Sequence, residues 1–426
     1  MSDRGSESSP TTPDTEASAP TRRGPRRLGP GLLVTAAFIG PGTVTTASVA
    51  GADFGFALVW ALVFSIVAAI VLQEMSARLG IVTRQGLGEA LRTTFHSRAV
   101  TVIVIALVIS AIAFGNAAFQ TGNLIGAGLG LEALAGGSFQ VWAVALGAVA
   151  FLLLFSGTYR WIERAVIGLV AVMSVVFIVT AVVVRPDLSE LLGGLVPRVP
   201  SGATVAVVAL IGTTVVPYNL FLHASLVREK WTEHTPVTTA LREARSDTYL
   251  SIGLGGLITL AIVTTAATVV FARGASIEDT ADMAAQMEPL LGPAADAFFA
   301  IGLCAAGLTS AITAPLAAAY AASGALGWKP DLTSMRFRAV WAIVLAFGTV
   351  LAAIGEDPVA AIVFAQAANG LLLPLIAVFL LVVANRGDLL GEHRNRAGRN
   401  AIGVTVVLVA AGLGLFNVLS AFGVVG

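Results

Sequence analysis

Two short segments combine helix-breaking residues with neutral oxygen donors. The first is Gly40-Pro41-Gly42-Thr43, and the second is the stretch 213–219, which reads Thr-Thr-Val-Val-Pro-Tyr-Asn and contains Pro217. Proline has no backbone N–H, so each segment frees main-chain carbonyl oxygens beside threonine, tyrosine and asparagine side chains. Neutral oxygens of this kind can coordinate a hard, partly hydrated cation or hydrogen-bond a small polar solute.

The composition around these segments is that of a membrane protein. Of the 426 residues, 56% are hydrophobic and 12% are charged, and the mean hydropathy is +0.87. A soluble domain carries roughly 25% charged residues, so this chain must be dissolved mainly in lipid. The 25 basic residues balance 25 acidic ones, which leaves no net charge to attract nucleic acid. The single cysteine, Cys304, excludes a disulfide framework, and its small neighbours predict helix packing.

The apolar stretches are long enough to cross a ~30 Å hydrocarbon core, which takes about 20 residues each. They predict an all-α integral membrane protein with one transmembrane domain over 28–425. The third and eighth stretches are longer than a crossing needs, which predicts tilt or extension beyond the bilayer. The eleven predicted spans are 29–51, 55–78, 99–129, 138–156, 162–184, 203–228, 247–272, 293–325, 337–355, 358–384 and 401–425.

The basic residues predict the orientation of these spans. Twenty-two Lys and Arg fall on one side of the predicted membrane, whereas only Arg185, Arg198 and Arg273 fall on the other. Because basic loops stay in the cytoplasm, we expect a multi-pass protein of the inner membrane with a cytoplasmic N-terminus and an external C-terminus. Residues 1–27 are rich in Ser, Thr and Pro and have no apolar run, so they predict a disordered cytoplasmic tail.

The two helix-breaking segments fall near the middle of the first and sixth predicted spans. The two breaks therefore lie five spans apart. A unit of five spans crosses the membrane an odd number of times, so two consecutive units have opposite topologies. This spacing predicts inverted repeats over about 29–184 and 203–384, with an extra helix at 401–425. Broken helices at matching places in inverted halves are typical of the midplane binding site of a secondary transporter. A single break would be better explained as a simple proline kink, but two polar breaks in register favour the transporter.

Several motifs make the chain resemble the Nramp family of divalent-metal transporters. Gly40-Pro41-Gly42-Thr43 falls where that family has Asp-Pro-Gly-Asn, and the stretch 216–223, Val-Pro-Tyr-Asn-Leu-Phe-Leu-His, falls where it has Met-Pro-His-Asn-Leu-Tyr-Leu-His. The stretches 72–80 and 309–316 are similar to its second and eighth helices, and Gln366 matches its tenth-helix glutamine. The resemblance implies a leucine-transporter-like fold that moves a divalent metal cation by alternating access. The metal would be the substrate, and no cofactor is implied.

The metal-site residues of this family are altered in the chain. Gly40, Thr43 and Val216 stand where the family has the Asp, Asn and Met that bind Mn²⁺ or Fe²⁺, so by resemblance they are candidate binding positions without the family's ligand side chains. Gln120 and Asn123 stand where the family has an acidic pair associated with proton transfer. Because neither amide can change its charge, we expect weak or absent proton coupling. By resemblance His223 could belong to a proton route, although a lone helix histidine is more often a packing residue.

The remaining candidates for binding are neutral oxygens. We expect a substrate site formed by the carbonyl oxygens near Gly40 and by side chains from three spans: Thr43, Thr213, Tyr218, Asn219, Gln366 and Asn369. Asn219 and Gln366 are the strongest candidates because amides in lipid need partners, whereas a membrane threonine usually bonds its own backbone. Without a carboxylate or a thioether, such a set suits a hard ion such as Mg²⁺. Glu74 and the other carboxylates lie near predicted helix ends and are expected to be solvated or interfacial.

Other functions stay open at this point. The same scaffold could carry a small organic solute, or the chain could be a non-transporting membrane sensor. An enzyme is not expected, because no nucleophile–base pair, phosphate loop or zinc-ligand spacing is present. The polar stretch 231–246 predicts a cytoplasmic linker helix. Beyond a divalent cation and the lipid bilayer, no obligatory protein partner is expected.

Overall fold

The computed structural model describes residues 30–31, 39–95, 97–157, 160–232, 234–329 and 331–421. The predicted tail at 1–27 therefore lies outside the described residues. Within them the first helices are α2 (Pro41–Phe54), α3 (Val59–Thr83), α4 (Leu87–Thr94), α5 (Arg98–Ala135), α6 (Phe139–Ser156) and α7 (Arg160–Val183). Next come α8 (Leu188–Gly193), α9 (Thr204–Thr214), α10 (Pro217–Lys230) and α11 (Val237–Val269).

The last part of the chain is also helical. It contains η1 (Phe271–Arg273), α12 (Thr280–Ala285), α13 (Glu288–Leu291), η2 (Gly292–Ala294) and α14 (Ala295–Leu326). It ends with α15 (Met335–Ile354), α16 (Pro358–Ala384), α17 (Gly387–Leu390), η3 (Gly391–His393) and α18 (Ala397–Ala421). The expected all-α fold is confirmed for the described ranges, and the long third and eighth spans correspond to α5 and α14, with 38 and 32 residues.

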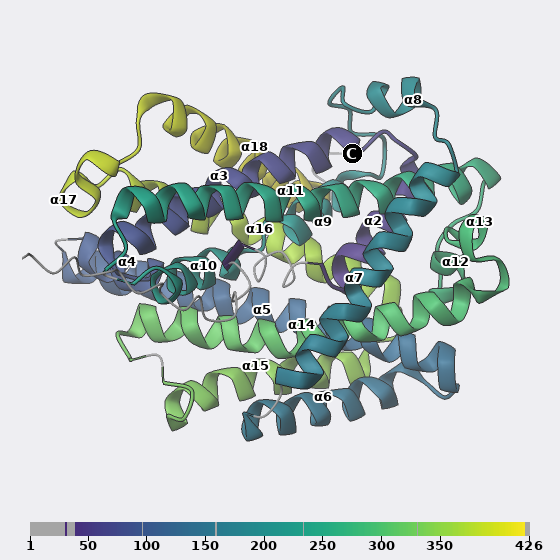
Figure 1. The fold of residues 1–426 in the computed structure, drawn as a ribbon, viewed down its shortest axis with the longest axis horizontal. Helices are drawn as coiled ribbons and strands as arrows, with labels where there is room; N and C mark the ends of the chain where they lie inside the picture. The colour runs from purple at the N-terminus through teal and green to yellow at the C-terminus, as the bar shows by residue number, and fades with distance from the viewer. Residues whose placement is uncertain are drawn as a thin grey trace, which may run out of the picture.

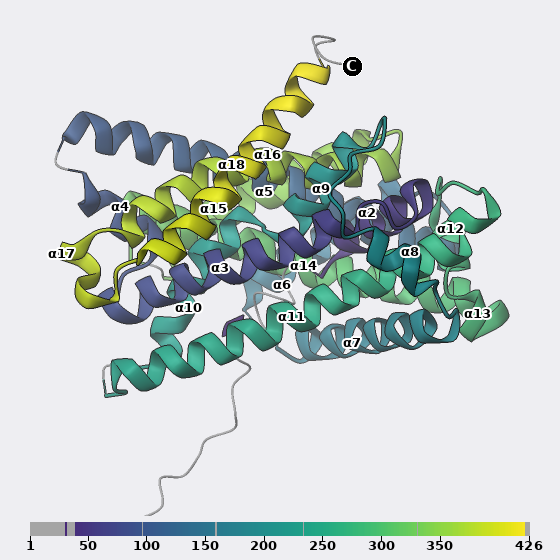
Figure 2. The ribbon, with the colours of Figure 1, turned by 90° about the horizontal axis from the view of Figure 1, so that it is seen from above.

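Ten segments of the described chain are long and apolar enough to cross a membrane, and they match the second to eleventh predicted spans. The first predicted span, 29–51, is described only in part, so the count of eleven stays a prediction. The long helices run side by side, with α4 and α17 at one end of the molecule and α8, α12 and α13 at the other (Figures 1 and 2).

Small residues allow the central helices to approach closely. A Cβ built on Gly130 of α5 would lie 2.5 Å from the Ala300 carbonyl oxygen and 2.9 Å from Cβ of Cys304, both on α14. Gly212 of α9 and Gly370 of α16 likewise pack against each other's helix backbones. This packing through glycine is typical of membrane helices, where close contact replaces the hydrophobic driving force. It confirms the packing role expected for Cys304 and brings α16 against the sixth span.

The stretch 231–246 differs from its expected form. A separate linker helix is wrong, because residues from Val237 onward are the first turns of α11 itself. Ala240, Leu241 and Ala244 form a small apolar cluster with residues of α3 and α10, including Ile81 and Val227. That burial continues the helix beyond the apolar stretch, toward the end of the molecule where α4 and α17 lie (Figures 1 and 2).

Candidate functional site

The sixth span is interrupted at the expected place. Helix α9 ends at Thr214, Val215 and Val216 are non-helical, and Pro217 starts α10 as its first residue. Val216 has an extended backbone with φ −76° and ψ 121°. Because Pro217 has no N–H, the carbonyl of Thr213, four residues earlier, loses its helical donor. The break therefore presents backbone oxygens inside the bundle, whereas the Val216 side chain is apolar and offers no ligand atom.

The other segment lies in the part of the first span that the structure describes from residue 39 onward. Gly40 is extended, with φ −126° and ψ −172°, and Pro41 is the first residue of α2. The Gly40 carbonyl accepts the first helical hydrogen bond from the N–H of Val44, at 3.1 Å. Residues 32–38 lie outside the described ranges, so the interruption is seen from the α2 side alone. The N-terminal end of α2 carries a partial positive charge and points its free N–H groups toward this region.

A hydrogen bond joins the two segments. The Thr43 hydroxyl of α2 lies 2.7 Å from the Thr213 hydroxyl of α9, and both side chains are buried. Thr214 behaves as expected for a membrane threonine, since its hydroxyl donates to the Leu210 carbonyl of its own helix at 2.9 Å. Thr213 instead turns toward the other broken helix. The structure thus brings two of the predicted ligands together.

Gln366 lies beside both segments. Its side-chain amide occupies the space that a Cβ on Gly42 would need, and its Nε2 is 3.5 Å from the Cβ position of Gly122 on α5. Its carbonyl oxygen packs against Gly212 at the end of α9. Gln366 is fully buried. Helix α16 therefore places the side-chain amide of Gln366 against α2 and α5, while the backbone carbonyl of the same residue packs against α9.

A second polar group lies against Gly40. A Cβ on Gly40 would be 2.6 Å from the Ser310 hydroxyl of α14 and 3.6 Å from Oδ1 of Asn123 on α5. Asn123, predicted for a proton or gating pathway, therefore borders the start of α2. Ser310 was missed as a site residue. Its motif was recognised, but a serine in a helix gives no sign that it faces another helix.

Several buried polar atoms in this region have no hydrogen-bond partner among the described residues. Both amide atoms are unpartnered in Asn123, Asn219, Gln366 and Asn369, and so are the hydroxyls of Tyr218 and Ser310. An unpartnered buried polar group costs free energy, and a cluster of them calls for an explanation such as a ligand. Asn369 lies one helical turn from Gln366, where a Cβ on Gly115 would be 2.9 Å from its Oδ1. Neutral donors and acceptors dominate this arrangement.

The other two predicted pathway residues are held by neutral partners. The Gln120 amide donates to the Ala311 carbonyl of α14 at 3.2 Å. His223 Nδ1 lies 2.8 Å from Oε1 of Gln73 on α3, and because a carbonyl oxygen accepts, Nδ1 is the donor. Gln73 was missed as its partner, although it lies in the recognised second-span motif. No cluster of three or more histidine, cysteine or acidic side chains that could hold a metal occurs in the part of the chain that the structure describes.

The expectation that Glu74 is a solvated residue near a helix end is wrong. This residue lies well inside α3, which continues to Thr83, and its side chain is 7% exposed. Arg78, Arg245 and Arg399 surround its carboxylate. The sequence placed Glu74 at a helix end because the polar residues after it lower the local hydropathy, whereas the helix continues for two more turns.

Comparisons with known proteins agree with this geometry. Residues 31–420 match the family described as "Nramp: Natural resistance-associated macrophage protein-like". The chain belongs to the Nramp family. A divalent metal cation transporter MntH of Deinococcus radiodurans is 32% identical over 403 residues, covering 91% of this chain and 89% of the relative. The MntH of Burkholderia ambifaria is 29% identical over 399 residues, covering 93% and 89%.

Solved structures support the leucine-transporter-like fold of this Nramp chain. A variant of the manganese transporter of Eremococcus coleocola has a TM-score of 0.71 at 23% identity, covering 92% of this chain and 86% of the other. Mhp1, a nucleobase-cation-symport-1 family transporter, has a TM-score of 0.59 at 16% identity, covering 94% and 95%. At sequence identities this low, the structural similarity supports the fold and not the function. The leucine-transporter-like fold is confirmed, whereas the count of eleven helices and the bounds of the two repeats stay predictions. Membership of a transporter family agrees with the expectation of a transporter rather than an enzyme.

Proposed function

We propose that this Nramp chain moves a hard divalent cation across the cell membrane by alternating access, through a site of neutral oxygens. The observation that carries the proposal is the Thr43–Thr213 hydrogen bond between the two interrupted segments, with the Gln366 amide beside it. The free carbonyls of the break, the threonine hydroxyls and the buried amides supply oxygen ligands. MntH relatives are named divalent metal cation transporters, which supports this substrate class.

The absence of a formal charge in this set decides which cation fits. Moving a bare dication into a low-dielectric site is costly, and a carboxylate normally offsets part of that cost. Here Gly40 and Val216 supply neither a carboxylate nor a soft sulfur ligand. A cation that keeps several of its waters avoids the full cost, and Mg²⁺ is such an ion. We therefore infer that Mg²⁺ is preferred, and that Mn²⁺ is carried more weakly than by relatives with a charged site.

Transport is proposed to be uncoupled from protons along α5. The charged residues of this helix are Arg98 and Glu132, which lie at its two ends. Gln120 and Asn123 in its buried centre cannot titrate, and the buried His223 hydrogen-bonds the uncharged amide of Gln73. Uptake would then follow the cation gradient and the membrane potential. In the proposed topology, with the N-terminus in the cytoplasm, the side with α4 and α17 faces the cytoplasm.

Uptake by the purified protein in liposomes tests the proposal. Mg²⁺ and Mn²⁺ would be compared with a neutral amino acid, each with and without a pH gradient, while a trapped dye reports internal pH. We expect Mg²⁺ uptake without internal acidification, and its loss in Asn219→Ala and Gln366→Ala. Internal acidification that depends on Mg²⁺ would contradict uncoupled transport. Amino-acid uptake without metal uptake would instead indicate an organic-solute carrier. No uptake of any of these substrates would indicate a non-transporting membrane sensor.

A further inference from the structure

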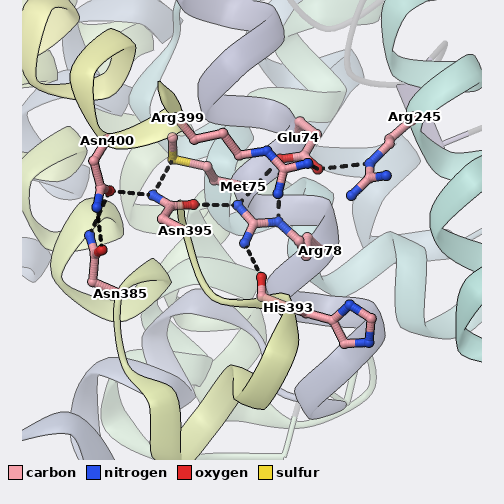
Figure 3. A network of polar contacts seen from close by, with 9 residues as sticks. All are labelled: Glu74, Met75, Arg78, Arg245, Asn385, His393, Asn395, Arg399 and Asn400. Carbon is pink, nitrogen blue, oxygen red and sulfur yellow. Dashed lines mark hydrogen bonds and ion pairs between the residues drawn. The ribbon is translucent and has the colours of Figure 1, made fainter. Parts of the chain in front are cut away.

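A cluster of four ionisable side chains lies away from the proposed transport site. The Glu74 carboxylate of α3 accepts from Nε of Arg245 on α11 at 2.9 Å and pairs with Arg78 at 3.3 Å and with Arg399 of α18 at 3.8 Å (Figure 3). One carboxylate thus faces three guanidinium groups, and the cluster carries a net charge of +2. Nothing in the transport mechanism uses this charge.

The three arginines have different surroundings. The Arg78 side chain is 1% exposed and also donates to the His393 carbonyl and, at 2.6 Å, to Oδ1 of Asn395. These bonds attach the loop before α18 to α3, so Arg78 has a structural role. Arg245 and Arg399 are 36% and 39% exposed. Their guanidinium groups are held by Glu74 yet accessible, which suits them for binding an anion.

A cavity of ≈ 150 Å³ adjoins this cluster, and α3, α11 and α18 form its walls. Glu74 and Arg399 line its polar end, and Arg245 reaches Glu74 from α11. The rest of the lining includes Ile70 and Val71 of α3, Tyr249 of α11 and Ile402 of α18.

The polarity of this cavity follows the direction of the helices. Helix α3 runs toward the end of the molecule that carries α4 and α17, so Ile70 and Val71 lie deeper in the membrane than Glu74. Helices α11 and α18 run the opposite way, so Tyr249 and Ile402 lie deeper than Arg245 and Arg399. Tyr249 and Ile402 are 49% and 46% exposed on membrane-spanning helices, where an exposed surface faces acyl chains. The cavity is therefore charged at its shallow end and apolar toward the bilayer centre.

We propose that this cavity binds an anionic phospholipid of the adjoining leaflet, with the phosphodiester at Arg245 and Arg399 and an acyl chain along Ile402. Guanidinium groups bind phosphate oxygens in a bidentate manner, and basic pockets between membrane helices bind anionic head groups. Free inorganic phosphate would use the charged end alone, whereas the apolar end matches a lipid. In the proposed topology this is the cytoplasmic leaflet. The bound lipid would join α3, α11 and α18.

Lipid titrations of the purified full chain in detergent test this site. Dioleoylphosphatidylglycerol, dioleoylphosphatidylcholine and inorganic phosphate would be added separately, with lipid retention followed by native mass spectrometry and stability by thermal unfolding. We expect retention and a higher unfolding midpoint with phosphatidylglycerol alone. Equal effects of phosphatidylcholine would overturn the proposal, and so would an equal shift with phosphate at the same concentration, because the site would then bind a soluble anion.

Matched variants separate the cavity from general electrostatics. Arg245→Gln with Arg399→Gln is expected to weaken phosphatidylglycerol binding at least roughly tenfold. Arg242→Gln with Arg396→Gln removes the same charge from exposed positions nearby, and binding is expected to stay unchanged. Ile402→Trp fills the cavity without changing its charge, so it should also abolish the retention of phosphatidylglycerol. If the variant with both Arg245→Gln and Arg399→Gln does not fold, Ile402→Trp still tests whether the lipid occupies the cavity. Equal losses in the test and control pairs, or normal retention by Ile402→Trp, would refute the site.

Discussion

The Thr43 hydroxyl lies 2.7 Å from the Thr213 hydroxyl, although 170 residues separate them in the chain. Each threonine belongs to a helix that starts or stops inside the bundle, so this bond joins the two places where backbone oxygens are exposed. A cation bound there would interact with both segments at once. Alternating access moves the two sides of a site relative to each other, which makes this pair a direct probe of the mechanism.

Removing the hydroxyl pair should affect transport more than stability. Thr43→Val and Thr213→Val each delete one partner of a buried hydrogen bond, which costs about 1 kcal/mol of unfolding free energy. We expect Mg²⁺ uptake to fall severalfold in either variant, and the double variant to be no worse than the singles. Thr180→Val is the control, because the buried Thr180 hydroxyl donates to the Val176 carbonyl of its own helix α7 and, among the described residues, bonds no other helix. Uptake that falls equally in Thr180→Val would contradict a specific role for the pair.

The contact between Gly42 and Gln366 gives a second prediction. A methyl group on Gly42 would overlap the end of the Gln366 side chain, which can swing away without moving the backbone. Gly42→Ala should therefore fold normally yet displace the amide and reduce uptake to the level of Gln366→Ala. The double variant should equal the singles, because both changes remove the same ligand. Independent, multiplying losses of uptake would show that Gln366 is not the affected group.

Gly212→Ala is the matched comparison for that variant. Its added methyl would overlap the Gln366 backbone carbonyl, which belongs to α16 and cannot move alone. We expect a loss of stability of roughly 1–3 kcal/mol from this overpacking, measured as lower thermal unfolding and poorer expression. The two glycines thus separate a functional contact from a structural one. A stable, active Gly212→Ala protein would mean that α9 and α16 are less tightly packed.

Much of the fold could be predicted because its signals are local. The sixth span was expected over 203–228, and α9 and α10 together cover Thr204–Lys230, with the break at the expected proline. Apolar length and a missing N–H are both readable without knowing what packs nearby. The start of α11 was not predictable in this way. Its first turns are polar in sequence, and they are helical because Ala240 and Leu241 pack against other helices.

The residues of the site likewise differ in whether a local signal in the sequence could reveal them. Asn219 and Gln366 could be proposed because a buried amide needs a partner wherever it lies. Ser310 could not, because its importance depends on Gly40 being placed beside it by the folding of α2 against α14. Glu74 was assigned to solvent because the sequence does not show that Arg245 and Arg399, far along the chain, approach it. Long-range ion pairs leave no local pattern.

His223 provides a test of the proton proposal. Its Nδ1–H donates to Gln73 Oε1, so His223→Gln can keep a donor there, whereas His223→Leu leaves Oε1 unpaired at a cost of roughly 1–3 kcal/mol. We expect His223→Gln to retain uptake with the same rate at about pH 6 and about pH 8, the range over which a free histidine would titrate. His223→Leu should be less stable. A pH dependence in the native protein that disappears in His223→Gln would assign the histidine a proton-transfer role.

Restoring a carboxylate at Gly40 should change the preferred cation. The extended backbone of Gly40 accepts any residue, but a Cβ there would lie 2.6 Å from the Ser310 hydroxyl. The Ser310 hydroxyl is the end of a short side chain and can rotate away, so Gly40→Asp alone is expected to fold. Gly40→Asp with Ser310→Ala removes the contact altogether and adds a negative charge beside the break. In the double variant we expect the KM for Mn²⁺ uptake to fall roughly tenfold, which corresponds to about 1.4 kcal/mol.

Ser310→Ala alone is the control and should keep the native KM for Mn²⁺. If the double variant folds and transports Mg²⁺ but its KM for Mn²⁺ is unchanged, Gly40 does not border the cation, and the proposed site must lie elsewhere in the bundle.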